Sequence, residues 1–543
     1  MKINEAAGKI IIYSIPLVTL SFTPFISYDP FNAPKFLSLC ILGSVITIIL
    51  VAQAFKQPLF FIQKPVIVSA AFIAWILISL IFSPSNLEDG MFGLPGRHMG
   101  VLTYIFLSIF LISSISVSDK RFLRQLGFFL KVTGVIVMIY GYLQVLQLDP
   151  VSWSIPPAAG FSFFGNQNFL SAFMGISSVL ALSILFKTDT NAMRKFVNVI
   201  YIFASIILIY YTKSTQGFLI FFAGSSIFMV IWLWRSEKYS KFLPFFQIFI
   251  GAIVVFLLLD IFQKTPWPSQ LYESSISSRG DFWRSAWRTA WENPIFGVGF
   301  DGFVDYYRLN RDLNSILARG SEIRADSAHN LFLDIFVGGG FIALLLFILV
   351  IFFVVKCSLK YIRNSREFDA GHAGLFGSWF AFIVQSSISV NQISLALVGW
   401  ILSGTLIGYK VNSEKDIKVT KINPKWIAAV LISPLMGIFI GAPTFVQDAK
   451  FRQAISAGDA RLLIEISNSW PRSSDRISLI GGVLRTNGFP IESREVLRRG
   501  IKFNPNHFET WRELYLCPGI SDSERNIARK RMVALDPYGS EVM

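Results

Sequence analysis

The side chains of this sequence best suited to chemistry lie between residues 261 and 330. Seven arginines occur there (Arg279, Arg284, Arg288, Arg308, Arg311, Arg319 and Arg324), together with His329, the one histidine of the stretch. Guanidinium is a planar fork that binds two phosphate oxygens at once and keeps its charge. Imidazole is the side chain best able to take a proton from an attacking hydroxyl near neutral pH. The stretch therefore favours phosphate capture beside a proton acceptor.

The arginines of segment 277–303, SSRGDFWRSAWRTAWENPIFGVGFDGF, are predicted to lie on one helix. Ser277 or Ser278 can cap its start, and Asn293-Pro294 ends it. Tryptophans form one stripe and arginines the next (Trp283, Trp287, Trp291; Arg284, Arg288, with Arg279 at the entrance). Two interpretations stay open: a helix at the lipid headgroup level, or a clamp for the pyrophosphate of a lipid-linked substrate.

His329 and Asn330 stand where the chain turns back into an apolar stretch that carries Gly338-Gly339-Gly340. A histidine there is either a hydrogen-bonding residue of the membrane interface or a general base. Arg308 and Arg319 have no comparable motif around them, and we expect their removal to cost much less activity.

Metal and nucleic-acid binding are not favoured. The three cysteines and four histidines are scattered without ligand spacing, so we expect no metal site, disulfide framework or cofactor. The net charge of +15 follows a membrane pattern instead of marking a nucleic-acid surface.

Composition excludes a soluble or a disordered protein. The chain is 53% hydrophobic and 15% charged, against about 25% charged in soluble domains. Thirteen apolar stretches are long enough to span a bilayer, and we read the first as an anchor and not a cleaved signal. They are residues 10–27, 36–55, 65–83, 100–117, 127–148, 168–186, 196–212, 216–234, 242–260, 331–355, 373–390, 393–409 and 426–443.

Basic residues predict the orientation. Alternate short loops hold twenty lysines and arginines, including the run Lys410–Lys425, whereas the loops between them hold Lys35, Arg97 and Lys213. Because basic loops stay in the cytoplasm, we expect a cytoplasmic N-terminus. The membrane domain would be 1–443, with loop 261–330 and a soluble tail, 444–543, both on the periplasmic side.

The tail is predicted to consist of helical hairpins. Pro471 and Pro505 lie 34 residues apart, the spacing of tetratricopeptide repeats. Helices are expected at 474–487, 490–503, 506–516 and 522–535. An unrelated small helical bundle is the alternative. Stacked hairpins would present a concave surface to a protein partner or a long ligand.

Ionisable groups are nearly absent from the predicted spans, with Lys131 and Asp334 near span ends. Ion-coupled transporters keep such groups at membrane depth, so this class is disfavoured, whereas a passive channel is not.

Several motifs together resemble the O-antigen ligase and O-antigen polymerase superfamily over roughly residues 80–345. They are Arg279-Gly-Asp-Phe-Trp283, Asn293-Pro294-Ile-Phe-Gly297-Val-Gly299 and His329-Asn330, with Phe164-Gly165-Asn166-Gln167-Asn168 and Gly96-Arg97-His98-Met99-Gly100 on other outer loops. The tetratricopeptide-like tail is similar to that of longer members.

The resemblance implies a GT-C-like fold: an all-α polytopic membrane protein with a helical-repeat tail, in a bacterial inner membrane. It implies a metal-independent glycosyltransferase that uses an undecaprenyl-pyrophosphate-linked glycan. Arg279 would hold the pyrophosphate and His329 would activate the acceptor. Arg284, Arg288, Asn166, Asn168 and Asn330 are expected to bind substrate. Where the family often has a further arginine this chain has Thr215, and Lys213 or Arg97 would supply that charge.

The acceptor stays open. Lipid A–core would make the protein a ligase, another lipid-linked glycan a polymerase, and a protein side chain an O-oligosaccharyltransferase. A passive transporter or channel with a periplasmic docking domain is the alternative from a different class.

Overall fold

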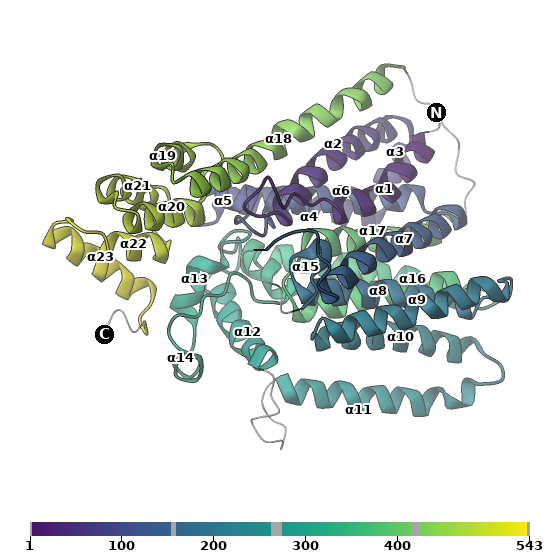
Figure 1. Cartoon of the computed structure of the whole chain (residues 1–543). Coiled ribbons are helices and arrows are strands. Elements are labelled where there is room, and N and C mark those ends of the chain that lie inside the picture. Colours follow the sequence, from purple (N-terminus) through teal and green to yellow (C-terminus); the bar gives the residue numbers. More distant parts are fainter. Residues whose placement is uncertain (1–2, 154–158, 262–273, 414–423, 540–543) are drawn as a thin grey trace.

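The computed structural model describes residues 3–153, 159–261, 274–413 and 424–539, and every regular element in these ranges is a helix. The predicted all-α polytopic class is confirmed. In Figure 1 the long helices lie side by side in one bundle, and the C-terminal helices α19–α23 project from one end of it. Lys415, Lys418 and Lys421, which belong to a loop predicted to be cytoplasmic, fall outside the described ranges.

Eight of the described helices are long and apolar enough to cross a membrane. They are α2 (Asn32–Lys56), α4 (Lys64–Phe82), α7 (Lys120–Val145), α8 (Gln167–Leu185), α9 (Ala192–Tyr211), α10 (Thr215–Arg235), α15 (Leu331–Asn364) and α18 (Pro424–Ala457). Five further helices are α1 (Ile3–Thr19), α6 (Val101–Val117), α11 (Leu243–Ile261), α16 (Ala370–Ile388) and α17 (Ile393–Ser413). Each predicted span thus coincides with a helix.

The prediction for the first span is wrong at its C-terminal end. We expected residues 10–27, but α1 stops at Thr19. Pro24 disfavours a helical Thr23 before it, and the Thr23 amide instead donates to the Pro30 carbonyl at 3.0 Å. Residues beyond Thr19 therefore form a loop at the end of the bundle.

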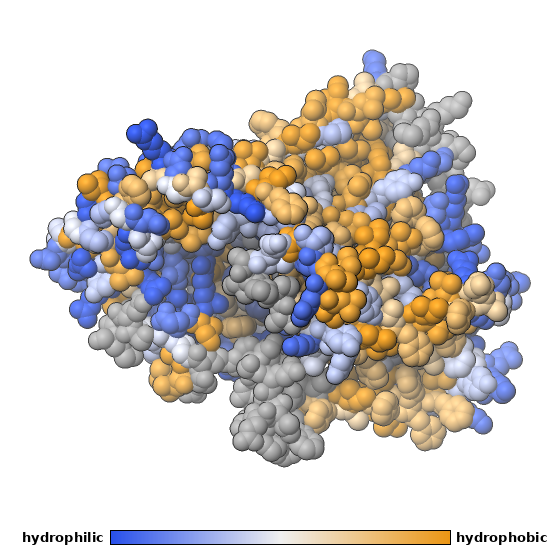
Figure 2. Space-filling view, viewed as in Figure 1, coloured by the Kyte–Doolittle hydropathy of each residue, from blue (hydrophilic) through white to orange (hydrophobic). Residues whose placement is uncertain are grey.

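The outer surface of the bundle is apolar. Figure 2 shows hydrophobic residues covering the bundle and hydrophilic residues gathered on the tail. Phe245 and Ile248 of α11 and Leu431 and Phe439 of α18 are each more than 70% exposed. Such a continuous apolar surface is what a lipid-facing protein requires.

The long loop carries α12 (Ser274–Glu292), α13 (Phe303–Asn310) and α14 (Leu313–Arg319). The expected cap at Ser277 or Ser278 is wrong, because α12 begins one turn earlier. In the tail, α20 (Ser474–Thr486), α21 (Pro490–Phe503), α22 (Phe508–Tyr515) and α23 (Asp522–Leu535) lie where helices were predicted. Helix α19 (Ala460–Asn468) was not predicted, and residue 443 lies inside α18.

A break in α15 fixes the long loop against the bundle. Gly340 has φ 74°, and a Cβ there would lie 1.9 Å from the Ile295 carbonyl oxygen, so only glycine fits. The carbonyls of Val337 and Gly338, freed beside the break, accept hydrogen bonds from the loop. The Val298 amide donates to Val337 O at 2.7 Å, and the Gly299 amide donates to Gly338 O at 3.1 Å. The Asn293–Gly299 motif and the glycine triplet are therefore one structural unit, which sets α12 relative to the start of α15.

Candidate functional site

Asp301, directly after this unit, organises the loop that carries Arg97. Its Oδ2 accepts from the backbone amides of Leu94 at 3.1 Å and Met99 at 3.0 Å. Its Oδ1 lies 3.4 Å from the Arg97 guanidinium, and both side chains are at least nine-tenths buried. Burial raises the pKa of Asp301, and the nearby Arg97 charge opposes that rise. Asp301 thus holds the whole Gly93–Gly100 turn.

Arg97 also reaches the loop that ends in His329. Its guanidinium donates to the Asp326 carbonyl oxygen and lies 3.7 Å from the Asp326 carboxylate. Arg97 therefore joins Asp301 and Asp326, which come from the two ends of segment 301–326. This contact brings the predicted Arg97 and His329 motifs into one site.

His329 is held in a fixed orientation. Its backbone has φ 54°, a sparsely populated region for a residue other than glycine. The His329 amide donates to Ser327 Oγ at 2.9 Å, and Ser327 Oγ donates to Asp334 at 2.8 Å. Nδ1 lies 3.2 Å from the Ser327 carbonyl oxygen. Because a carbonyl only accepts, this contact assigns the proton to Nδ1 and leaves the lone pair on Nε2.

Helix α12 brings Arg279 to His329. The Phe282 ring packs on the His329 ring with centroids 5.1 Å apart, and Arg279 precedes Phe282 by one helical turn on the same face. Arg279 is 8% exposed. Burial lowers the pKa of His329, and the charges of Arg97 and Arg279 lower it further against the opposing effects of the Ser327 hydrogen bond and Asp326. Arg97, Arg279 and His329 thus form one buried, charged site, called here the arginine–histidine site.

Arg284 and Arg288 lie on the other face of α12. Arg284 Nε donates to Asp312 Oδ2 at 2.8 Å, and Arg288 lies 2.5 Å from Asp312 Oδ1. Arg284 also pairs with Asp281. Both arginines are about half exposed. The structure therefore brings them together around Asp312 and not around His329.

The predicted asparagines act partly as helix caps. Asn330 Oδ1 accepts from the amides of Phe332 and Leu333 at the start of α15. Asn166 caps α8 in the same way through the Asn168 amide at 2.8 Å. Asn168 Oδ1 in turn accepts from Ser214 Oγ at 2.7 Å, next to the exposed Lys213, whose φ is 56°. Asn166, Asn168 and Lys213 form a second polar group.

Buried Lys35 connects this second group to the loop of Arg97. Its ammonium donates to three backbone carbonyls, those of Ser21 at 3.1 Å, Phe31 at 2.9 Å and Phe163 at 2.7 Å. Nearby, Asn32 Nδ2 donates to the Gly96 carbonyl at 2.7 Å. Sequence reasoning used Lys35 only as a loop charge. Its position at the start of an apolar helix was the signal for a buried, structural role.

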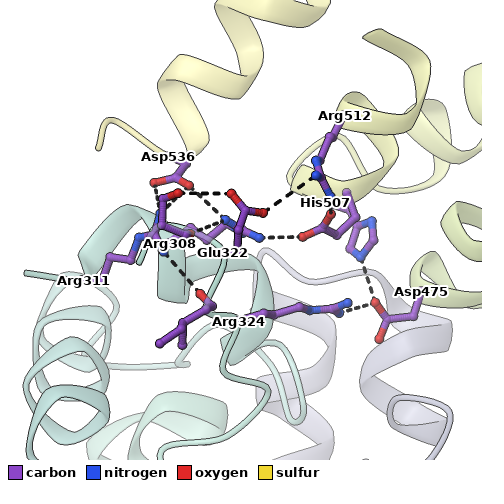
Figure 3. Close-up of polar contacts among 11 residues, drawn as sticks. Arg308, Arg311, Glu322, Arg324, Asp475, His507, Arg512 and Asp536 are labelled. Atoms are coloured by element: carbon purple, nitrogen blue, oxygen red, sulfur yellow. Dashed lines mark hydrogen bonds and ion pairs between the residues drawn. The ribbon is translucent and has the colours of Figure 1, made fainter. Parts of the chain in front are cut away.

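Three of the seven loop arginines hold the tail (Figure 3). Arg308 and Arg311 both pair with Asp536, at 3.1 and 2.6 Å, and Asp536 is fully buried. Arg308 also lies 2.9 Å from Glu509. Arg308 therefore sits in a buried ion-pair network although no sequence motif surrounds it, and the expectation that its removal costs much less activity than that of Arg279 stays a prediction. The side chain of Arg319 falls outside the described part of the structure.

A second contact joins the loop and the tail at Asp475, in the first turn of α20. Asp475 pairs with Arg324 and accepts from His507 Nε2 at 3.0 Å. Burial alone would raise the pKa of Asp475, but these two partners hold it below its ordinary range. The tail is therefore fixed on the same end of the bundle as the arginine–histidine site.

A hollow of about 760 Å³ lies between the tail and the outer loops. Gly96 and Arg324 form part of its wall, and these residues belong to the two segments joined by Arg97 and Asp326. Tyr28 and Phe451 pack edge to face there at 4.8 Å, and Asp29, Glu509 and Glu513 add carboxylates. Ligand pockets commonly measure about 300–1,000 Å³. We call this space the tail hollow.

Sequence reasoning missed the carboxylates that build the site. Asp301, Asp326 and Asp334 anchor Arg97 and the segment before His329, and only Asp334 drew attention from the sequence. In the ranges that the structure describes, no group of three or more histidine, cysteine or acidic residues is arranged to hold a metal ion.

The part of the chain that contains Arg279 and His329 matches a known family. Residues 200–348 match the family described as O-antigen ligase. The match supports the resemblance to the O-antigen ligase and polymerase superfamily, and with it O-antigen-ligase-type glycan transfer by a multi-pass membrane protein. A search of curated proteins found no match to the chain.

Proposed function

We propose that this chain, with its match to the O-antigen ligase family, is a glycosyltransferase that moves a glycan from undecaprenyl pyrophosphate to an acceptor hydroxyl. The observation that carries the proposal is the convergence of Arg97, Arg279 and His329. Two cations that keep their charge stand beside a histidine whose pKa is lowered. This arrangement suits an anionic leaving group next to a nucleophile that must lose a proton.

The reaction would be a single displacement. The acceptor hydroxyl oxygen attacks the anomeric carbon of the first sugar, while the bond from that carbon to the pyrophosphate oxygen breaks. The lipid pyrophosphate leaves with the bonding electrons, and the acceptor proton passes to Nε2 of His329. The tautomer set by the Ser327 carbonyl leaves this nitrogen able to accept it.

Arg279 would bind the pyrophosphate as the charge on the leaving oxygen grows. A guanidinium already in place in a buried site stabilises that charge without reorganisation. Arg97 would act mainly by its field, because its guanidinium is committed to Asp301 and Asp326. Lys213, Asn166 and Asn168 are the candidates to hold a more distant part of the donor, whereas Arg284 and Arg288 would position α12 through Asp312.

The acceptor would approach through the tail hollow. Its wall includes both segments that meet at Arg97, so a long molecule lying there has one end beside the arginine–histidine site. Carboxylates and arginines can bind sugar hydroxyls, and the exposed edge of Tyr28 adds an apolar surface. This lining favours a glycan acceptor, as in a ligase or polymerase, over a protein acceptor.

The protein would lie in a bacterial inner membrane with the site and the tail in the periplasm. The basic loops support this orientation, because residues 120–124 lie across α6 from Arg97. A donor activated by a lipid pyrophosphate needs no nucleotide sugar, which suits that compartment. The tetratricopeptide-like tail, which forms part of the hollow, would hold the acceptor or a protein partner.

The test is the mass of the product. The purified full-length protein is incubated with an undecaprenyl-pyrophosphate-linked glycan and, separately, with lipid A–core, a second lipid-linked glycan or an acceptor protein. The proposal expects one acceptor to gain the mass of the glycan, with release of undecaprenyl pyrophosphate. Release of the lipid without transfer to any of the three would contradict it.

A further inference from the structure

A large, open hollow lies at the opposite end of the membrane helices from the arginine–histidine site. Arg97 precedes α6, and Asp119, in the wall of this hollow, follows its last turn. Seventeen helical residues at about 1.5 Å each separate the two ends. The hollow has a volume of about 1,760 Å³, and nothing proposed so far for the protein uses it. We call it the basal hollow.

Positive charge gathers in its wall. Six basic side chains line it, against four acidic ones. Arg124 of α7, Lys187 after α8 and Arg194 of α9 also meet Lys131 in an adjoining small cavity. Burial lowers the pKa of Lys187, and the like charges of Arg194 and Arg124 lower it further, against the opposing effect of Asp369. Cations from three segments of the chain are therefore held close enough to repel one another.

The acidic side chains of the hollow offset these cations only in part, and Asp369 is the one that opposes the lowering of the Lys187 pKa. None of Arg124, Lys187 and Arg194 has a carboxylate within 4.0 Å in the described ranges. Two of the acidic side chains are used as helix caps instead. Asp119 accepts from the Phe122 amide at 2.6 Å, and Asp369 accepts from the amides of Gly371 and His372. The acidic side chains of the hollow therefore offset only part of its positive charge, and a bound anion would offset the rest.

Three helices also begin at the rim of the basal hollow. They are α7 after Asp119, α9 after Asn191 and α16 after Asp369. The side chain of each of these three residues already caps its own helix, so the helix ends themselves add little positive charge to the hollow. Aromatic rings also line the hollow, with Phe186 and Trp232 packed at 5.3 Å. Cations and aromatic rings in one lining suit an anion that carries an apolar group.

The positive-inside rule alone does not explain this arrangement. Lys238 and Lys241 are basic loop residues of the same end, but each ammonium lies 5.3 Å from a neighbouring aromatic ring, that of Tyr239 or Phe242. Neither lines the basal hollow. A topological signal needs only the charge, whereas Arg124, Lys187 and Arg194 come from separate segments of the chain to one cavity.

We propose that the basal hollow is a binding site for a phosphate group, held by Arg124, Lys187 and Arg194. The phosphate would come either from the headgroup of an anionic phospholipid of the surrounding leaflet or from a soluble phosphate compound. Basic pockets between membrane helices are suited to phospholipid headgroups. The site is independent of the glycosyl transfer proposed above.

The experiment compares two double variants of the full-length protein. Arg124→Ala/Arg194→Ala removes two cations of the basal hollow, and Lys238→Ala/Lys241→Ala removes two cations of the same end outside it. Detergent-solubilised protein is titrated with phosphatidylglycerol, with phosphatidylcholine as the uncharged comparison, and bound lipid is counted by native mass spectrometry. In a parallel arm the melting temperature is measured against inorganic phosphate. Arg124→Lys/Arg194→Lys, which keeps both charges, controls for folding.

The proposal expects wild type, the lysine variant and the Lys238/Lys241 variant to retain phosphatidylglycerol over phosphatidylcholine. The affinity of the Arg124/Arg194 alanine variant for phosphatidylglycerol should fall by roughly tenfold or more. A second outcome would identify a soluble phosphate compound as the source of the phosphate. In that case the wild type shows no preference for phosphatidylglycerol, and inorganic phosphate raises the melting temperature of every protein except the Arg124/Arg194 alanine variant. Equal losses in the two alanine variants, or binding of neither probe by the wild type, would overturn the proposal.

Discussion

The ring of His329 packs against the ring of Phe282 with centroids 5.1 Å apart. Two segments almost fifty residues apart in the sequence thereby meet at the start of α15. Phe282 lies one turn after Arg279, so the same contact places the proposed donor-binding arginine beside the proposed base. The break at Gly340 supports this geometry, because it joins the end of α12 to α15.

The pH dependence of transfer should report the environment of His329. Burial and the charges of Arg97 and Arg279 lower its pKa below the ordinary 6.5. A base with a lowered pKa stays neutral to lower pH, so the rate should be lost only as pH falls through a value below 6.5. The measurement is the rate at saturating donor across pH. Arg97→Gln removes one of the charges and should move the acid limb towards higher pH. An acid limb above 6.5 in the wild type would contradict this assignment.

Arg279→Lys should be nearly as inactive as Arg279→Ala. Lysine keeps the charge but loses the planar fork that binds two phosphate oxygens. Removing one preorganised donor of this kind typically costs about 10²–10³-fold in rate. Arg498→Lys is the matched control, since Arg498 pairs with Glu524 on an exposed face of the tail. Near-normal transfer by Arg279→Lys would show that arginine geometry is irrelevant at that position.

Arg308→Ala should loosen the tail. Its buried guanidinium pairs with Asp536 and Glu509 and stacks over the Phe508 ring at 4.4 Å. Breaking a buried ion pair from one side commonly costs about 3–5 kcal/mol, and Arg311 would retain part of the interaction with Asp536. Protease cleavage near residue 457 and the melting temperature measure the loss. Arg498→Ala removes an exposed ion pair and should change protease cleavage and the melting temperature only slightly. Equal effects of the two substitutions would contradict the anchoring role.

Leu479→Trp should weaken acceptor use without affecting the donor. Leu479 is 44% exposed and lines the tail hollow, so the larger ring occupies space that the acceptor needs. The acceptor concentration for half-maximal transfer should rise while donor binding stays constant. Ile491→Trp places the same ring on α21 away from the hollow and is the control. Unchanged acceptor dependence in Leu479→Trp would remove the hollow from the proposed mechanism.

Helices were predictable because their signals are local. The length of each apolar stretch predicted a helix at each expected span. The proline spacing predicted the tail helices α20–α23 to within two residues. The site was predictable only in part. Arg279 and His329 carry recognisable motifs, but Arg308 does not, because its partners Glu509 and Asp536 lie some two hundred residues away. Arg284 looked equivalent to Arg279 by type, and only the packing of α12 showed that the two face different neighbours.

The most direct test of the central claim is glycan transfer by His329→Ala, measured with donor affinity and melting temperature on the same preparation. If His329 is the base, transfer should fall by roughly 10²–10⁴-fold. Binding of the lipid-linked donor should persist, because Arg279 is untouched. A joint loss of transfer, donor affinity and melting temperature would assign His329 a structural role, and unchanged transfer would contradict the mechanism outright.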